Sequence, residues 1–375
     1  MKKKALLFIA AIIAAACFTQ KAGATIWRVN NQSNYNGSSL YGDNFGGTAA
    51  IPVFKQISQA VAFGIVNDGD TLHIEGSTAV YNGATITKKL VIIGAGYLLT
   101  DNPKTSNNTL DTKIDYITFN TKSEGSQVIG LNIIYYTGNG GYCYVNVSGV
   151  TVKRCRLERG VDLGSGINDV YILENFFPSQ YPTNAILSCC GGFVPPTDIV
   201  FNNNICQKTL VWGDSGPSAN PTNLWPILQC NNNVFDGPDN LATPNLAFST
   251  SEFKNNILMP VNGSVNIASS AGVVAYNIGT LSTQFGTANN NLVVPAITTL
   301  FVTSTSTDGA YQVATSSQAS NNGSDGTDRG AFGGAAAISR YTLSGLAAIP
   351  VIYQITTTGA TSTNLPVSIS ARTIK

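Results

Sequence analysis

One short segment of the 375-residue chain carries its densest group of charged residues: Lys153, Arg154, Arg156, Glu158, Arg159 and Asp162. One interpretation is an anionic-sugar or lyase subsite in which Arg159 or Arg154 acts near Asp162. The other is a solvated outer face with local ion pairs, which is the commoner meaning of such a run. We favour the second interpretation and keep the first as an alternative.

Aromatic side chains near expected turns form a second set of candidates. Exposed tyrosines and tryptophans can stack on sugar rings, and they can equally cover the edges of a fold. The sequence does not separate the two roles. The aromatics of this kind are Tyr135, Tyr136, Tyr142, Tyr144, Trp212 and Trp225, and the ligand-binding candidates among them are Tyr142, Tyr144, Trp212 and Trp225.

Residues that metal or hydrolytic sites need are sparse. His73 is the single histidine, and it shares an outward face with Thr71 and Glu75, which favours a structural surface role. Cys189-Cys190 lacks the spacing of a zinc site, and the adjacent Ser188 has no nearby base. The sequence therefore indicates no metal and no cofactor.

A repeated pattern between Ser126 and Gly279 must position these candidates. It reads apolar, any, apolar, two polar residues, Asn, any, apolar, and Val170 to Phe177 is the clearest copy. Successive anchors lie 20 to 29 residues apart, which predicts a solenoid of stacked coils. The anchors are Leu131, Cys155, Asn175, Asn204, Asn233, Asn256 and Asn277.

The register of the repeat assigns each position to the inside or the outside. Two inward rows are apolar throughout: Val128, Val152, Ile172, Phe201, Cys230, Phe253, and Ile133, Leu157, Phe177, Cys206, Phe235, Leu258. The Asn row should form an internal hydrogen-bonded ladder at a tight turn, bonding the backbone of its own turn and the amide of its neighbour. One outward row is unusually apolar and needs a cover: Phe176, Ile205, Val234 and Ile257, after Arg156.

The N-terminus is typical of a secretory signal peptide. Lys2 to Lys4 precede an apolar run that is too short for a membrane span, and Ala22 to Ala24 offer a cleavage site, so we expect cleavage after Ala24. An acylated Cys17 is the less favoured alternative.

The remaining 351 residues hold 17 basic and 20 acidic side chains and no basic block, which argues against nucleic acid as a partner. No other apolar run is long enough to cross a bilayer.

Six cysteines follow the expected cleavage point, and the even number invites disulfides. The register argues against full pairing, because Cys206 and Cys230 point inward from different slots and Cys155 occupies the Asn slot. We expect these three to be small core residues with free thiols.

The first part of the chain carries a resemblance to a known fold family. An amphipathic helix is expected at residues 54–63, followed by Gly69-Asp70-Thr71, a turn with Tyr81, and Lys89-Leu90-x-Ile92-x-Gly94. This order resembles the start of right-handed parallel β-helix proteins of the pectate-lyase-like superfamily. The resemblance implies an all-β, single-stranded right-handed solenoid with the helix as its N-terminal cap, and it implies polysaccharides as the class of partner.

The catalytic residues that the resemblance implies are not found. A calcium-dependent lyase would carry acidic residues on the outer face of one strand row, and that row holds one carboxylate, Asp162. Hydrolases of this fold need neighbouring carboxylates, and no Asp-Asp or Gly-His-Gly occurs. The candidate segments of the row are 141–146, 160–163, 184–187, 210–212, 245–248 and 265–267.

These observations predict three parts and one leading function. Residues 1–24 form the signal peptide, 25–334 the β-helix domain, and 335–375 a strand-like tail that packs along or caps the solenoid and shields the apolar stripe. We expect an exported, non-catalytic scaffold that binds glycans or builds a cell surface of a bacterium or its periplasm. The alternative is a polysaccharide lyase or glycoside hydrolase with an atypical site near Arg154–Asp162. The sequence leaves the oligomeric state open.

Overall fold

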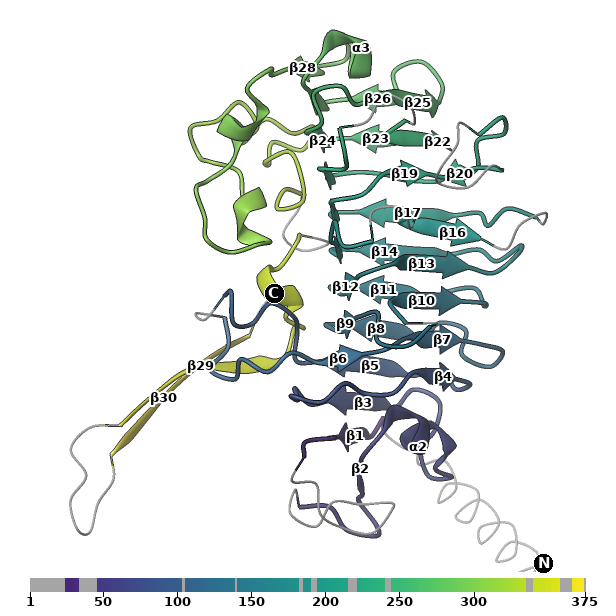
Figure 1. The fold of residues 1–375 in the computed structure, drawn as a ribbon, viewed down its shortest axis with the longest axis vertical. Helices are drawn as coiled ribbons and strands as arrows, with labels where there is room; N and C mark the ends of the chain where they lie inside the picture. Colours follow the sequence, from purple (N-terminus) through teal and green to yellow (C-terminus); the bar gives the residue numbers. More distant parts are fainter. Residues whose placement is uncertain are drawn as a thin grey trace, which may run out of the picture.

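The structure is a computed structural model that describes residues 24–33, 46–102, 105–138, 140–181, 185–189, 194–214, 221–239, 244–334, 340–357 and 366–373. Residues 1–23 of the expected signal peptide, including Cys17, lie outside the described residues, as does Cys190. The chain is predominantly β, with parallel strands in stacked sheets (Figure 1). This arrangement is compatible with the β-helix solenoid that the repeat predicts. Within the described ranges, no helix is both long enough and apolar enough to cross a membrane.

Three parallel sheets run along the stack, and we call them A, B and C. Sheet A contains β2 (Val53–Phe54), β1 (Ile26–Val29), β3 (Thr71–Ile74), β5 (Val91–Gly94), β8 (Gln127–Ile129), β11 (Thr151–Lys153), β14 (Val170–Leu173) and β17 (Ile199–Asn202). Sheet B contains β6 (Lys113–Ile114), β9 (Asn132–Ile133), β12 (Arg156–Leu157), β15 (Phe176–Phe177), β18 (Ile205–Cys206), β21 (Val234–Phe235), β24 (Ile257–Leu258), β27 (Ile278–Gly279) and β28 (Leu292–Val293). Sheet C contains β4 (Ala84–Ile86), β7 (Ile117–Phe119), β10 (Tyr142–Val145), β13 (Gly160–Leu163) and β16 (Leu187–Cys189). From β5 to β16 the chain contributes one strand to sheet A, then one to B, then one to C, and repeats this order. Each such circuit of three strands is one coil.

The later coils continue the stack with smaller sheets. One sheet contains β19 (Leu210–Val211), β22 (Leu246–Thr250), β20 (Pro226–Ile227) and β25 (Val265–Ala268), and another pairs β23 (Phe253–Lys254) with β26 (Val274–Ala275). Short helical segments follow: α3 (Ser282–Phe285), η2 (Ile297–Leu300), η3 (Gly309–Tyr311) and η4 (Leu343–Gly345). The expected outer-row segments therefore overlap β10, β13, β19, β22 and β25, and the segment 184–187 meets β16 at Leu187 alone.

The predicted interior is confirmed. Every member of the two inward rows is buried, and Val128, Val152, Ile172 and Phe201 are aligned by the pairing of sheet A. The expected helix is shorter than predicted: α2 spans Ile57–Ala62, because Phe54 belongs to β2. This helix lies at the N-terminal end of the stack (Figure 1).

The Asn row forms the expected ladder, and its bonds run between coils. The Nδ2 of Asn204 donates to the carbonyl of Ile172 in the preceding coil (3.0 Å) and to Oδ1 of Asn233 in the next (3.1 Å). The backbone N–H of Asn175 donates to Oδ1 of Asn204 (2.9 Å). The expected bond to the residue's own turn is thus replaced at Asn204 by bonds to neighbouring coils. The residue before each anchor has a left-handed backbone, with φ at 72° for Gly130 and at 52° to 59° for Arg154, Glu174, Asn203, Asn232, Asn255 and Tyr276.

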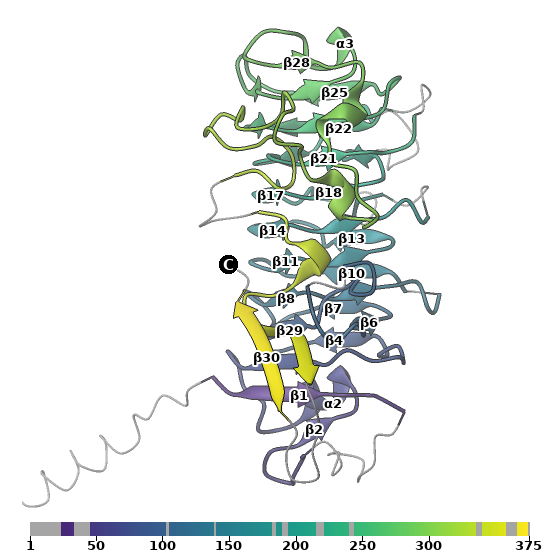
Figure 2. The same ribbon diagram turned by 90° about the vertical axis from the view of Figure 1, so that its left-hand side faces the viewer.

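The outward apolar stripe is fully covered. Phe176, Ile205, Val234 and Ile257 are buried in a second hydrophobic cluster, separate from the interior of the stack. Its other members are Tyr97, Ile278, Val294, Ile297, Leu300, Tyr311, Ala319, Ala331 and Tyr341. The cover therefore comes mainly from 294–331, which lies along one side of the stack (Figures 1 and 2), and the expected tail contributes Tyr341.

A hairpin projects from the body close to the C-terminus. Strands β29 (Pro350–Thr357) and β30 (Val367–Thr373) form an antiparallel pair that extends away from the stack (Figure 1). The two strand-like segments predicted in the tail are thus present. Ile369 at 61% exposure and Val367 at 50% show that the hairpin leaves apolar side chains uncovered.

Candidate functional site

The charged segment divides into two structural groups. Arg154 and Lys153 both pair with Glu174, at 2.5 Å and 2.9 Å. Glu174 is fully buried, and Arg154 also donates to the carbonyl of Leu346 (2.8 Å). The ion pairs of the favoured interpretation are present, but the solvated face is wrong at Arg154, because the returning chain buries the Arg154–Glu174 pair. Arg154 is held at the turn between β11 and β12, whereas Asp162 lies on β13 in sheet C, so the two are not brought together.

The second group fixes a loop that carries tyrosines. Arg156 pairs with Glu158 (2.8 Å), and the other oxygen of the Glu158 carboxylate accepts the backbone N–H of Tyr135 (2.8 Å). The buried carboxylate of Asp115 accepts the N–H of Thr137 (2.8 Å) and that of Tyr136 (3.1 Å). Two buried carboxylates therefore hold the 135–137 loop in place.

Arg159 lies among three tyrosine rings. Its guanidinium carbon is 4.0 Å from the ring centroid of Tyr135, 5.4 Å from that of Tyr142 and 5.7 Å from that of Tyr181. Its Nη1 donates to the carbonyl of Gly138 (3.2 Å), and its Nε is buried without a hydrogen-bond partner. Such distances allow cation–π attraction, which preorganises both the cation and the rings.

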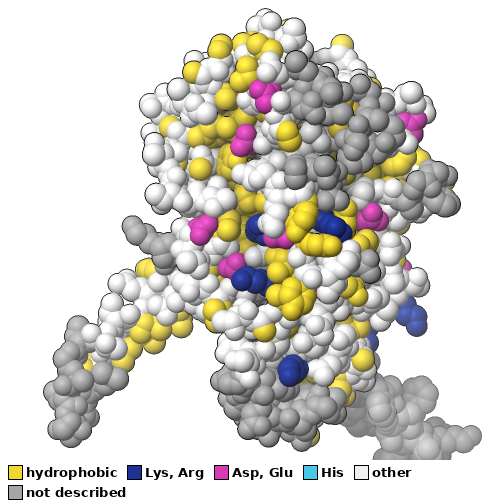
Figure 3. Space-filling model, in the orientation of Figure 1, with side chains coloured by type: hydrophobic (Ala, Val, Ile, Leu, Met, Phe, Trp, Pro, Cys, Tyr) yellow, Lys and Arg dark blue, Asp and Glu magenta, His cyan; other side chains and the backbone are white. Residues whose placement is uncertain are grey.

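Two further tyrosines extend this surface over sheet C. Tyr144 lies 5.5 Å from Tyr142 and 6.3 Å from Tyr116, measured between ring centroids. We call the five tyrosines with Arg159 the tyrosine–arginine platform; its members are Tyr116, Tyr135, Tyr142, Tyr144, Tyr181 and Arg159. All are half-buried or exposed. Figure 3 shows hydrophobic, basic and acidic side chains gathered in the middle of one face, at the level of β12 in Figure 1.

The sequence places these rings through simple alternation. Cys143 and Val145 of β10 point into the core, so Tyr142 and Tyr144 must point outward. The Tyr116 ring packs over Gly83, where a Cβ atom would lie 2.0 Å from the ring. A larger residue at position 83 would displace that tyrosine.

A buried lysine supports the platform from behind. The Nζ of Lys208 donates to the carbonyl of Glu158 and, at 3.5 Å, to that of Arg159. Lys208 is 1% exposed, and burial lowers its pKa to about 7. A ligand on the surface cannot reach this amine, so its role is to hold the backbone that carries Arg159.

A polar row crosses sheet C next to the rings. Pairing aligns Thr85, Thr118, Tyr144, Asp162 and Ser188 on neighbouring strands, and none of them is buried. Ser188 donates to Oδ2 of Asp162 (2.7 Å). Burial, followed by the charge of Asp162, raises the pKa of Tyr144, so its phenol stays protonated at neutral pH. The row therefore offers hydroxyl groups around one carboxylate.

The tryptophan candidates lie elsewhere. Trp212 is 1% exposed, so the expectation that it is an exposed ring is wrong; its indole packs edge-on against Trp225 at 4.9 Å and donates to the carbonyl of Pro226. Trp225 is half-buried against the core. Trp212 is inaccessible because β19 turns it inward.

Sequence reasoning missed two members of the platform. Ile117 pairs with Cys143, so the residues before them, Tyr116 and Tyr142, are aligned by the coil register. This alignment could have identified Tyr116 as a candidate. Tyr181 lies in an insertion after β15 and carries no repeat signal. Its ring meets Tyr135 at 5.2 Å.

The four buried cysteines are not placed to act as nucleophiles. Cys143, Cys155, Cys206 and Cys230 are buried and form no disulfide, which confirms the free thiols expected at the last three. Burial raises the pKa of Cys155 to about 12, and it raises those of Cys143, Cys206 and Cys230 as well. Among the described residues, no group of three or more His, Cys, Asp or Glu side chains could hold a metal ion.

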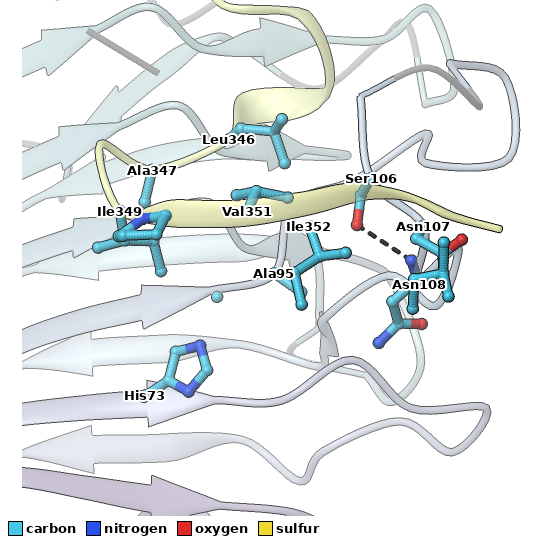
Figure 4. A pocket seen from close by; sticks show the side chains of 13 residues that line it. His73, Ala95, Ser106, Asn107, Asn108, Leu346, Ala347, Ile349, Val351 and Ile352 are labelled. Carbon is cyan, nitrogen blue, oxygen red and sulfur yellow. Dashed lines mark hydrogen bonds between the residues drawn. The ribbon is translucent and has the colours of Figure 1, made fainter. Parts of the chain in front are cut away.

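A separate cavity of about 350 Å³ lies at the root of the hairpin (Figure 4). Apolar side chains of the tail, including Leu346, Val351 and Ile352, face His73 and the 106–108 loop. Burial lowers the pKa of His73, which keeps the imidazole neutral at neutral pH. The cavity lining contains no carboxylate, lysine or arginine. It thus lacks the combination of rings and charges found on the platform.

No family model, no curated protein and no solved structure matches this chain. The fold and the platform define it as a parallel-stranded β protein with an outward tyrosine surface.

Proposed function

We propose that this protein is an exported, non-catalytic glycan-binding protein built on a single-stranded right-handed β-helix of the pectate-lyase-like type. The observation that carries the proposal is the platform, where three tyrosine rings surround Arg159 and two more continue across sheet C. Aromatic rings bind the apolar faces of sugars, and nearby hydroxyl and carboxylate groups bind sugar hydroxyls. Export to the cell surface or periplasm is supported by the N-terminal sequence.

Preorganisation favours binding on this surface. The 135–137 loop is fixed by Glu158 and Asp115, and Lys208 bonds the backbone carbonyls of Glu158 and Arg159. Because these groups are already held in place, less free energy is lost in ordering them when a ligand binds, and more of the contact energy appears as affinity.

Two observations favour binding over catalysis. Tyr144 stays protonated at neutral pH because its pKa is raised, and the Lys208 amine is enclosed, so neither can take a proton from a ligand on the surface. Glycoside hydrolysis uses a pair of carboxylates, and Asp162 is the one carboxylate on the described part of the polar row.

The test is a glycan panel with two readouts. We expect the purified protein to retain one or more polysaccharides in affinity electrophoresis, without release of unsaturated or reducing products. Arg159→Ala should weaken retention about tenfold or more, since it removes the cation that orders three rings.

A matched control is Arg28→Ala, which removes a surface ion pair with Glu75 on sheet A and should leave retention unchanged. Release of unsaturated products that disappears in Arg159→Ala would favour the lyase alternative. Absence of any retained glycan would refute the proposal.

A further inference from the structure

The polar row of sheet C bears on which kind of sugar the platform takes. Its outward groups are the hydroxyls of Thr85, Thr118, Tyr144 and Ser188 and the carboxylate of Asp162. Neighbouring strands are about 4.8 Å apart, so this row presents one hydrogen-bonding group per coil along the stack. A sugar ring is of similar length to this spacing.

The cation beside the row is largely occupied. Three tyrosine rings surround the Arg159 guanidinium. Its Nη1 donates a hydrogen bond to the carbonyl of Gly138, and its Nε is buried. Lys208 is enclosed behind the platform. Arg156 and Glu158 are paired with each other, so they add no net charge.

The carboxylate beside the row is more available. Asp162 is half-buried, and Ser188 occupies one of its oxygens. A carboxylate accepts hydroxyl hydrogens strongly, and it repels another carboxylate at close range. Asp162 raises the pKa of Tyr144 and Arg159 lowers it, so the positive charge of Arg159 is opposed by that of Asp162 where the row passes the rings.

We infer that the platform takes neutral glycans whose hydroxyl groups bond Asp162 and the flanking hydroxyls, with successive sugars lying along the stack across β7, β10, β13 and β16. This inference rests on the proposed glycan-binding function and narrows its substrate class. Polyuronates are excluded by the charge of Asp162, although the rings alone would accept them.

The experiment compares neutral and uronate oligosaccharides of equal length by calorimetric titration. We expect the native protein to bind the neutral series more tightly, with affinity rising up to about four sugars, since the proposed binding stretch of the row spans the four strands β7, β10, β13 and β16. Asp162→Asn should weaken neutral binding about tenfold and strengthen uronate binding, because it removes a strong acceptor and a repelling charge.

Two variants keep the test clear. Ser188→Ala frees the Asp162 carboxylate from its partner and should alter neutral binding by a smaller factor. Asp169→Asn changes an exposed carboxylate in the loop before β14 and should alter neither series. Native-like thermal midpoints would show that Asp162→Asn, Ser188→Ala and Asp169→Asn all fold.

Tighter binding of uronates by the native protein, with loss in Arg159→Ala, would overturn the inference and leave the glycan-binding function standing. Unchanged neutral binding in Asp162→Asn would overturn it as well. Failure to bind either series would overturn the proposed function and the inference together.

Discussion

The asparagine ladder shows how one residue type can hold successive coils at a fixed spacing. Each amide bridges two neighbours: Asn233 donates to the carbonyl of Phe201 and to Oδ1 of Asn256, and its own Oδ1 accepts from Asn204. The ladder extends beyond the repeat to Asn291, which accepts from Asn277. Buried amides of this kind stabilise only when every donor and acceptor is paired.

Asn204→Ala tests the ladder. The substitution leaves the N–H of Asn175 and the carbonyl of Ile172 buried without their partners. Each such loss costs about 1–3 kcal/mol, so we expect the free energy of unfolding in urea to fall by about 3 kcal/mol.

The control is Asn146→Ala, which removes an exposed amide bond to Asn120 and should change stability by about 0.5 kcal/mol or less. Equal effects of the two substitutions would contradict a structural role for the ladder.

Lys208 makes stability depend on pH. Its folded pKa of about 7 lies below the ordinary value of 10.5, so above pH 7 the unfolded chain binds a proton that the folded chain does not. Stability should therefore rise with pH from about 7 toward 10.5, and the penalty is fully present below pH 7.

The measurement is the urea midpoint at pH 6, 7, 8 and 9 for the native protein and for Lys208→Met, which keeps the stem and removes the charge. We expect the native midpoint to rise over this range relative to the variant. Parallel pH profiles would show that Lys208 retains an ordinary pKa. Binding should be followed in parallel, because this amine holds the backbone of Arg159.

Among the elements, the segment 294–331 replaces the tail as the cover of sheet B. Its apolar side chains bury the stripe, and the buried Asp308 carboxylate ties it to distant parts of the chain. Asp308 accepts from Asn102 (2.8 Å), from the hydroxyl of Tyr341 (3.1 Å) and from the N–H of Ser344 (2.8 Å).

Two truncations separate the cover from the hairpin. Ending the chain after Ala347 removes β29 and β30, which lie outside the described hydrophobic clusters, so the thermal midpoint and the binding of a hydrophobic dye should change little. Ending it after Val293 removes the cover and should increase dye binding and lower the midpoint sharply. An unstable protein after the first truncation would contradict this division of roles.

The sequence predicted those elements whose positions repeat. The inward rows, the strands of the outer row and the Asn ladder followed from a period and an alternation that recur in each coil. The need for a cover followed from Phe176, Ile205, Val234 and Ile257. Its identity did not, because residues 294–331 carry no repeat and their partners are distant in sequence.

The candidate site was predictable to a similar degree. Tyr142, Tyr144, Arg159 and Asp162 came from strand alternation and local charge density. Trp212 was misjudged because β19 lies past the clearest part of the register. Tyr181, the loop anchor Asp115 and the enclosed Lys208 depend on insertions and side-chain reach, which periodicity does not encode.

On the scale of the whole molecule, the stack brings together single contributions from many coils. Tyr116, Tyr142, Arg159 and Tyr181 come from successive circuits, and no one coil could bind a sugar alone. Only 11% of all residues are charged, so the surface offers hydroxyls, amides and rings in place of a strong electrostatic field. Such a surface suits an uncharged polymer that runs across several coils.

The most direct test of glycan binding at the platform compares two tyrosines of equal exposure. Tyr135 covers Arg159, whereas Tyr171 lies on β14 in sheet A, and both are 38% exposed. Calorimetric titration with a glycan retained in the panel should show that Tyr135→Ala weakens binding about tenfold or more and that Tyr171→Ala leaves it unchanged. Equal affinities of the two variants would contradict the platform as the glycan site.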